Sequence, residues 1–161
     1  GGSGPFDAHR RRVPADARPK DRQAAVMLID AGPLVALIHA DDRHHKRCTD
    51  ILRKLDEPLA TVWPAFTEAM YLLGFSWRAQ DALWELIDRD VVGFLALDDH
   101  DNRRARELMK KYRDLPMDLA DAALVSVAER DRISRIFTLD RRDFQLYRPA
   151  RMGRFQIVPA D

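Results

Sequence analysis

The sequence contains one cysteine and no apolar run near the roughly 18 residues that a membrane-spanning helix needs. Because Cys48 has no partner cysteine, an intramolecular disulfide and a thiolate metal cluster are both excluded. The N-terminus lacks the apolar core of a secretory signal. Together these absences predict a protein of the reducing cytoplasm that does not contact a membrane.

Neither sign of charge dominates, since the net charge is +1 over 161 residues. The charge is unevenly distributed, because residues 1–26 carry six basic and three acidic side chains and the remainder is slightly acidic. The folded part is therefore not a basic clamp for nucleic acid. To bind a polyanion, it would need local arginines or a metal ion.

Residues 1–26 are rich in Gly, Pro, Arg and Asp and show no apolar period. Such a composition predicts a flexible arm. Its first four residues, GGSG, are typical of a tag remnant. Regular patterning begins at Met27, so we expect one folded domain over residues 27–161, long enough to bury a core of its own.

From Met27 onwards, short apolar runs alternate with helical patterns. The apolar runs predict strands within residues 26–31, 58–63, 91–97, 135–140 and 155–158. The helical patterns cover residues 33–40, 44–55, 64–77, 78–89, 102–114 and 118–130. Strands separated by helices predict an α/β fold with a mostly parallel sheet of four to five strands, covered by helices on both faces.

Acidic residues stand where the predicted strands end. Asp30 ends the first strand and Asp140 ends the fourth. Glu68 lies early in the helix after the second strand, and Asp118 and Asp121 begin the helix before the fourth. Ligands bind at the carboxyl ends of strands in such sheets. If the first, second and fourth strands are neighbours, these carboxylates converge.

Several carboxylates cannot stay ionised within a few ångströms of one another without a cation. Hard divalent ions such as Mg²⁺ or Mn²⁺ prefer oxygen ligands of this kind. A site of this type activates water and neutralises a phosphodiester in its transition state. The joint placement of the acids therefore predicts a Mg²⁺ or Mn²⁺ site.

Each acid also has a structural interpretation. Asp30 could cap the following helix, and Asp118 and Asp121 fit an N-cap and N3 pair that resembles a capping box. Glu68 could be a solvated helix residue, and Asp140 could begin a turn. The structural interpretation is weaker for Asp121, because Asp is short for the reciprocal bond that Glu or Gln makes at N3.

Two further features have alternative interpretations. Trp63, Trp77 and Trp84 could stack on bases, although packing in the core or in a dimer is the preferred interpretation. The predicted helix over residues 102–114 has a basic face, for which solvation is the default and contact with RNA is the alternative.

Four stretches, LIDAGPLVALI, TEAMYLL, DLADAALVSVAE and IFTLDRRDF, occur in this order. As a set they resemble the PIN-domain family, and especially the VapC-type toxins of bacterial toxin–antitoxin pairs. The resemblance covers Met27 to about Val158. It implies a PIN-like three-layer α/β/α sandwich and a Mg²⁺- or Mn²⁺-dependent endoribonuclease that leaves 5′-phosphate and 3′-hydroxyl ends.

The resemblance also assigns roles by position. Asp30, Glu68, Asp121 and Asp140 match the family's four acids in that order. Asp30 and Asp121 are implied to be the main metal ligands, while Glu68 and Asp140 complete the shell and orient the attacking water. Asp118, one turn before Asp121, is an additional candidate metal ligand or a helix cap.

The implied partners are an RNA substrate, a cognate antitoxin of the VapB type and a second copy of the chain in a homodimer. An antitoxin of this type places a peptide across the active site. Residues 6–21 have the aromatic and arginine chemistry of such a tail, so the arm is either upstream sequence or an antitoxin-like segment.

Gly32 is a departure from the family pattern, because many relatives carry Asn, Ser or Thr at this position. The missing polar group favours, as the alternative function, a catalytically incomplete PIN-like module that binds RNA or protein. A phosphatase or DNA nuclease would share the same acidic ligands.

Overall fold

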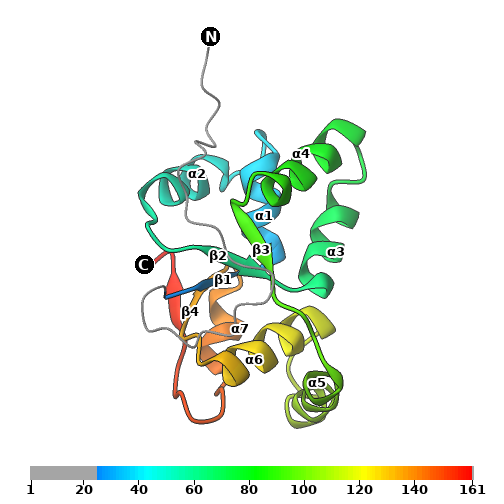
Figure 1. Ribbon diagram of the computed structural model, residues 1–161, viewed down its shortest axis with the longest axis vertical. Coiled ribbons are helices and arrows are strands. Elements are labelled where there is room, and N and C mark those ends of the chain that lie inside the picture. The colour runs from blue at the N-terminus through cyan, green and yellow to red at the C-terminus, as the bar shows by residue number, and fades with distance from the viewer. Residues whose placement is uncertain (1–24, 161) are drawn as a thin grey trace.

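Five short strands form one parallel sheet in the order β3-β2-β1-β4-β5 in the computed structural model, which describes residues 25–160 (Figure 1). Their bounds are β1 Met27–Ile29, β2 Leu59–Thr61, β3 Val92–Phe94, β4 Arg135–Phe137 and β5 Gln156–Val158. Strands β2, β1 and β4 are neighbours, as convergence of the acids requires. All but the last two residues of the predicted arm lie outside the described residues.

Helices cover both faces of the sheet (Figure 1). One face carries α1 Ala31–Ile38, α2 His45–Lys54, α3 Trp63–Leu72 and α4 Trp77–Asp88, and the other carries α5 Asp99–Lys111, α6 Leu119–Asp131 and α7 Arg141–Leu146. The predicted three-layer α/β/α sandwich is therefore confirmed. The six-residue helix α7 was not predicted, since its sequence is too short and too polar to show an apolar period.

The central strand β1 shows why the apolar runs are continuous. Met27 and Ile29 point into the core beneath α1–α4, while Leu28 points into the core beneath α5–α7. All three side chains are fully buried. A strand with helices on both faces needs apolar residues at every position, which is the pattern of a parallel sheet.

Helix boundaries follow local turn and capping chemistry. The helix expected over residues 64–77 ends at Leu72, and Ser76 caps the next helix by accepting from the Ala79 amide at 3.4 Å. Helix α5 begins earlier than expected because Asp98 caps it.

Within residues 25–160, no helix is long and apolar enough to span a membrane.

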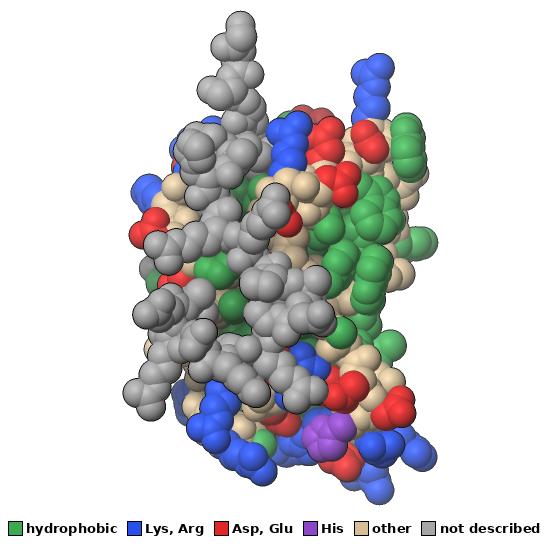
Figure 2. Space-filling model, viewed as in Figure 1, with side chains coloured by type: hydrophobic (Ala, Val, Ile, Leu, Met, Phe, Trp, Pro, Cys, Tyr) green, Lys and Arg blue, Asp and Glu red, His purple; other side chains and the backbone are tan. Residues whose placement is uncertain are grey.

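Hydrophobic side chains gather on one side of the molecule, over α3 and α4 (Figure 2). Trp77 is 69% exposed, and Trp63 and Trp84 are also exposed, so the interpretation of the tryptophans as core residues is wrong. Trp63 lies on the ring of Phe94 with ring centroids 4.0 Å apart. We call the exposed set the α3–α4 aromatic surface; it comprises Trp63, Tyr71, Leu72, Phe75, Trp77 and Trp84.

Candidate active site

The five predicted acids range from buried to exposed. Asp30 and Asp121 are 3% and 7% exposed, Glu68 is half-buried, and Asp118 and Asp140 are exposed. Asp30 follows β1, Glu68 lies in α3, Asp118 and Asp121 are the cap and third residue of α6, and Asp140 precedes α7. Two of the acids are therefore buried in the protein, and the others are accessible to solvent.

Both oxygens of Asp30 are held by the protein. Oδ1 accepts a hydrogen bond from the Ala31 amide at 2.8 Å, and Oδ2 accepts one from the Thr138 hydroxyl at 2.9 Å. The cap interpretation of Asp30 is thus observed. The pKa of Asp30 is nevertheless raised to about 7, chiefly by burial and also by the charges of Asp140 and Glu68, while the two hydrogen bonds lower it.

Asp121 is held in a different way. Its Oδ2 accepts a hydrogen bond at 2.9 Å from the hydroxyl of Tyr147, a residue that sequence reasoning did not identify. Burial raises the pKa of Asp121 to about 8, with further contributions from the charges of Asp118 and Asp30. Tyr147 was missed because an aromatic residue after a short, unpredicted helix has no distinguishing pattern.

The remaining acids lie in the same electrostatic field. Burial raises the pKa of Glu68, as do the charges of Asp118 and Asp140. Burial, then the charges of Asp143 and Asp118, raise the pKa of Asp140. These acids come from the end of β1, from α3, from the start of α6 and from the end of β4, and the charges of some act on the ionisation of others.

Helix N-termini face this group of acids. Asp30 and Asp118 are the N-cap residues of α1 and α6, and Asp121 lies in the first turn of α6. The positive end of each helix dipole favours negative charge there, as do the first-turn amides, which have no carbonyl partner within their helix. This stabilisation offsets part of the repulsion between the acids without removing it, since the pKa values remain raised.

A second acidic group lies elsewhere, at the start of α5. Within residues 25–160, the three side chains whose ligand atoms all lie within 4.8 Å of one another are Asp98, His100 and Asp101, and none of these belongs to the predicted site. Asp98 and Asp101 form a complete capping box, in which the Asp101 amide donates to Asp98 at 2.8 Å and the Asp98 amide donates to Asp101 at 2.9 Å.

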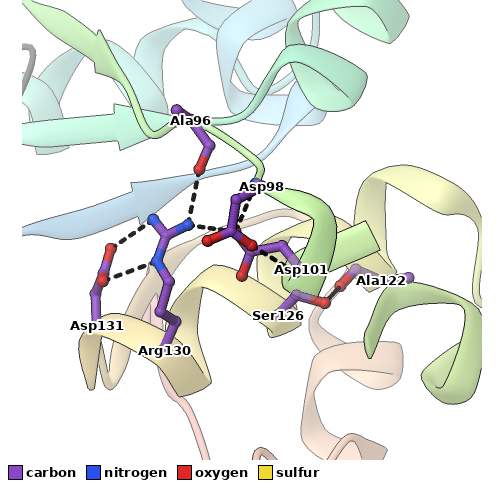
Figure 3. Close-up of polar contacts among 7 residues, drawn as sticks. All are labelled: Ala96, Asp98, Asp101, Ala122, Ser126, Arg130 and Asp131. Atoms are coloured by element: carbon purple, nitrogen blue, oxygen red, sulfur yellow. Dashed lines mark hydrogen bonds and ion pairs between the residues drawn. The ribbon is translucent and has the colours of Figure 1, made fainter. Parts of the chain in front are cut away.

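Arg130 already supplies the positive charge for this second group (Figure 3). Its guanidinium donates to the Asp101 carboxylate, to the Asp131 carboxylate at 2.9 Å and to the Ala96 carbonyl at 2.8 Å. Asp101 is only 1% exposed. The second group therefore holds α5 and α6 together, and the guanidinium of Arg130 supplies the positive charge that a metal ion would otherwise supply.

Gly32 leaves room for a small side chain. A Cβ at this position would lie 3.5 Å from the Leu139 side chain, which is an ordinary contact distance. Packing around residue 32 therefore does not require glycine, and a small polar side chain would fit there.

Comparisons with known proteins give the same family. Residues 27–150 match the family model described as PIN domain. The chain is 28% identical over 143 residues to a Mycobacterium tuberculosis protein named Ribonuclease VapC26, and the alignment covers 83% of this chain and 100% of the relative.

Two solved structures share the fold. The Mycobacterium tuberculosis toxin VapC20, described as cleaving the sarcin–ricin loop, has a TM-score of 0.63 at 18% identity and aligns with 68% of this chain and 86% of its own. A chain of a toxin–antitoxin complex from Klebsiella pneumoniae has a TM-score of 0.57 at 17% identity and aligns with 73% of this chain and 89% of its own.

We predict that Asp121→Asn stabilises the metal-free protein at alkaline pH. A carboxyl whose pKa rises from 3.8 to about 8 on folding contributes stability that is fully present below pH 3.8 and is lost as the pH rises through 8. The variant has no charge to bury, so at pH 9 in EDTA it should unfold with a free energy larger by about 1–3 kcal/mol.

The stability difference between the Asp121→Asn variant and the wild type should be clearly smaller at pH 5 than at pH 9, because pH 5 lies only a little above the unfolded pKa of 3.8 and the folded wild type still keeps Asp121 protonated. The exposed loop residue Asp114 is the control, and Asp114→Asn should change little at either pH. A variant at Asp121 that is less stable than the wild type at pH 9 would contradict the prediction.

We also predict that Arg130→Met destabilises the fold by about 3 kcal/mol, because it leaves the buried Asp101 carboxylate without its cation. Urea denaturation measures the loss. Arg103→Met, at an exposed position on α5, should be nearly neutral. Equal midpoints for the two variants would show that Arg130 does not clamp α5 to α6.

Proposed function

The chain belongs to the PIN domain family, as its motifs predict, and from this premise we propose that it is a metal-dependent endoribonuclease and the toxin of a VapBC-type pair. The group of buried acids with raised pKa values carries the proposal. The relative named Ribonuclease VapC26 and the fold shared with two toxin structures support it. We extend the nuclease domain over residues 27–161 and place its action in the cytoplasm.

The donor set fits a hard divalent ion. It offers carboxylate oxygens alone, and two of these carboxyls are buried deeply enough that ionisation is unfavourable without added positive charge. The residues proposed to hold Mg²⁺ or Mn²⁺ are Asp30, Asp121, Glu68 and Asp140, with Asp118 as a cap that also contributes charge. A bound ion would supply charge neutralisation at the scissile phosphate and a more acidic water.

The protein's own part is to orient these oxygens. The Thr138 hydroxyl donates to Asp30 and accepts from the Asp140 amide at 3.0 Å, so it links the first and fourth acids. Glu68 and Asp140, which are more exposed than Asp30 and Asp121, would complete the shell around the ion and orient the attacking water. Burial and the neighbouring acids raise the pKa of both carboxyls, so they too would gain from the positive charge of an ion.

The direct test is cleavage of RNA by purified variants. Asp30→Asn and Asp121→Asn should each reduce cleavage to background while the circular dichroism spectrum stays that of the wild type. Asp98→Asn is the matched control, because Asn caps a helix as well as Asp does and Asp98 belongs to the second acidic group. Retained cleavage in either site variant would refute the assignment.

Titration with Mn²⁺ separates the enzyme from the alternative function. An intact site should bind Mn²⁺ in the wild type and lose that binding in Asp30→Asn. A module that acts only by binding RNA or protein, which Gly32 favours, should bind no Mn²⁺ specifically. Parallel assays on single-stranded DNA and on a phosphomonoester test the two related metal-dependent activities.

A cognate VapB-type antitoxin and a homodimer complete the proposal. The observation that favours protein partners is the α3–α4 aromatic surface, since contiguous exposed apolar groups on a small protein mark interaction sites. We assign this surface to the contact between two copies of the chain. The acidic group, which lies at the sheet edge, is left to RNA or to a basic side chain of the antitoxin.

We expect light scattering to give twice the 18.5 kDa of one chain. Replacing Phe75 and Trp77 together by Ser should shift the protein towards the monomer, because both side chains are mostly exposed in one copy. Met109→Ser, which also replaces an exposed apolar side chain but on α5, should leave the dimer intact. A dimer that survives the double replacement would place the contact elsewhere.

A further inference from the structure

The chain contains the same Asp-x-x-Asp pattern at the start of two helices, with two different outcomes. In α5, the third-position carboxylate of Asp101 turns back and accepts from the Asp98 amide at 2.9 Å. In α6, the Asp121 amide donates to Asp118 at 2.9 Å, which is the first half of the same motif. The Asp121 carboxylate, however, accepts from the Tyr147 hydroxyl.

Packing fixes the position of that hydroxyl. Tyr147 is 0% exposed, and its ring lies 5.2 Å from the ring of Phe144 and 5.2 Å from the ring of Tyr112. Its backbone amide donates to the Asp143 carbonyl at 3.3 Å, which ends α7. A ring held on two sides and at its own backbone presents its hydroxyl at one point, and Asp121 is the acceptor there.

We propose that Tyr147 is a positioning residue, whose hydroxyl holds the Asp121 carboxylate within the acidic site and prevents it from closing a capping box on the Asp118 amide. The consequence for metal binding rests on the proposed function. The positioning itself does not, because it concerns the protein's own hydrogen bonds.

The contact also joins the segments that carry the third and fourth acids. Helix α7 begins after Asp140 and ends before Tyr147, so the hydroxyl ties the far end of α7 to the first turn of α6. At the other side of the site, Thr138 ties Asp140 to Asp30. Two neutral hydroxyls thus orient the two most buried carboxylates of the candidate site without neutralising their charge.

Tyr147→Phe tests the proposal, with Tyr112→Phe as the matched control. The Tyr112 hydroxyl is also buried in the same aromatic group, but it accepts from the Arg148 amide at 2.9 Å and does not contact an acid. Both variants therefore lose one buried hydroxyl and keep the rings.

Two measurements are made on each full-length variant. In metal-free protein, amide hydrogen exchange at Asp118 should slow in Tyr147→Phe, because Asp121 is released to accept from it, and should be unchanged in Tyr112→Phe. In calorimetry, Mn²⁺ affinity should fall by about 10-fold or more in Tyr147→Phe alone, and excess Mn²⁺ should restore most of the RNA cleavage.

Unchanged Asp118 exchange and unchanged Mn²⁺ affinity in Tyr147→Phe would overturn the proposal. Equal losses of affinity in both variants would overturn it as well, since they would indicate a role in packing only. If the wild type binds no Mn²⁺, the proposed metal function fails. Slower Asp118 exchange in Tyr147→Phe alone would then still support the positioning of Asp121.

Discussion

Two carboxyl groups, Asp30 and Asp121, are buried where the central strand ends and α6 begins, and the charge of Asp30 acts on Asp121. Burial raises the pKa of both groups into the neutral range, and the neighbouring acids add to the effect. Ionising them together in the folded protein is unfavourable unless positive charge is supplied. The surrounding structure is organised around this constraint, with helix N-termini and hydroxyl donors directed at the carboxylates.

The second acidic group shows how the same residues behave when the charge is satisfied. Asp98 and Asp101 share the spacing of Asp118 and Asp121, yet they close a capping box and receive the guanidinium of Arg130 (Figure 3). The carboxylates of Asp98 and Asp101 thus lie close together in a structural role, whereas Asp30 and Asp121, in the candidate site, are the buried carboxylates whose pKa values are raised. A carboxylate with a raised pKa is therefore a better indicator of an active site here than close spacing of acids.

Most of the strands and helices could be predicted from the hydrophobic pattern of the sequence, because buried parallel strands give continuous apolar runs and amphipathic helices give a regular apolar period. The observed sheet order meets the condition on which the grouping of Asp30, Glu68 and Asp140 at one edge depended, because β2, β1 and β4 are neighbours. Helix α7 could not be predicted, since six residues around Phe144 show no period. Tyr147 could not be predicted either, because its hydrogen bond to Asp121 depends on tertiary packing between residues 26 positions apart.

The most direct test of the account is a crystal grown with Mn²⁺ and measured for anomalous scattering. The account predicts an anomalous peak bounded by the carboxylates of Asp30 and Asp121, with Asp98 and Asp101 still paired to Arg130. A peak at Asp98 and Asp101, or no peak beside Asp30 and Asp121 at a saturating Mn²⁺ concentration, would contradict it.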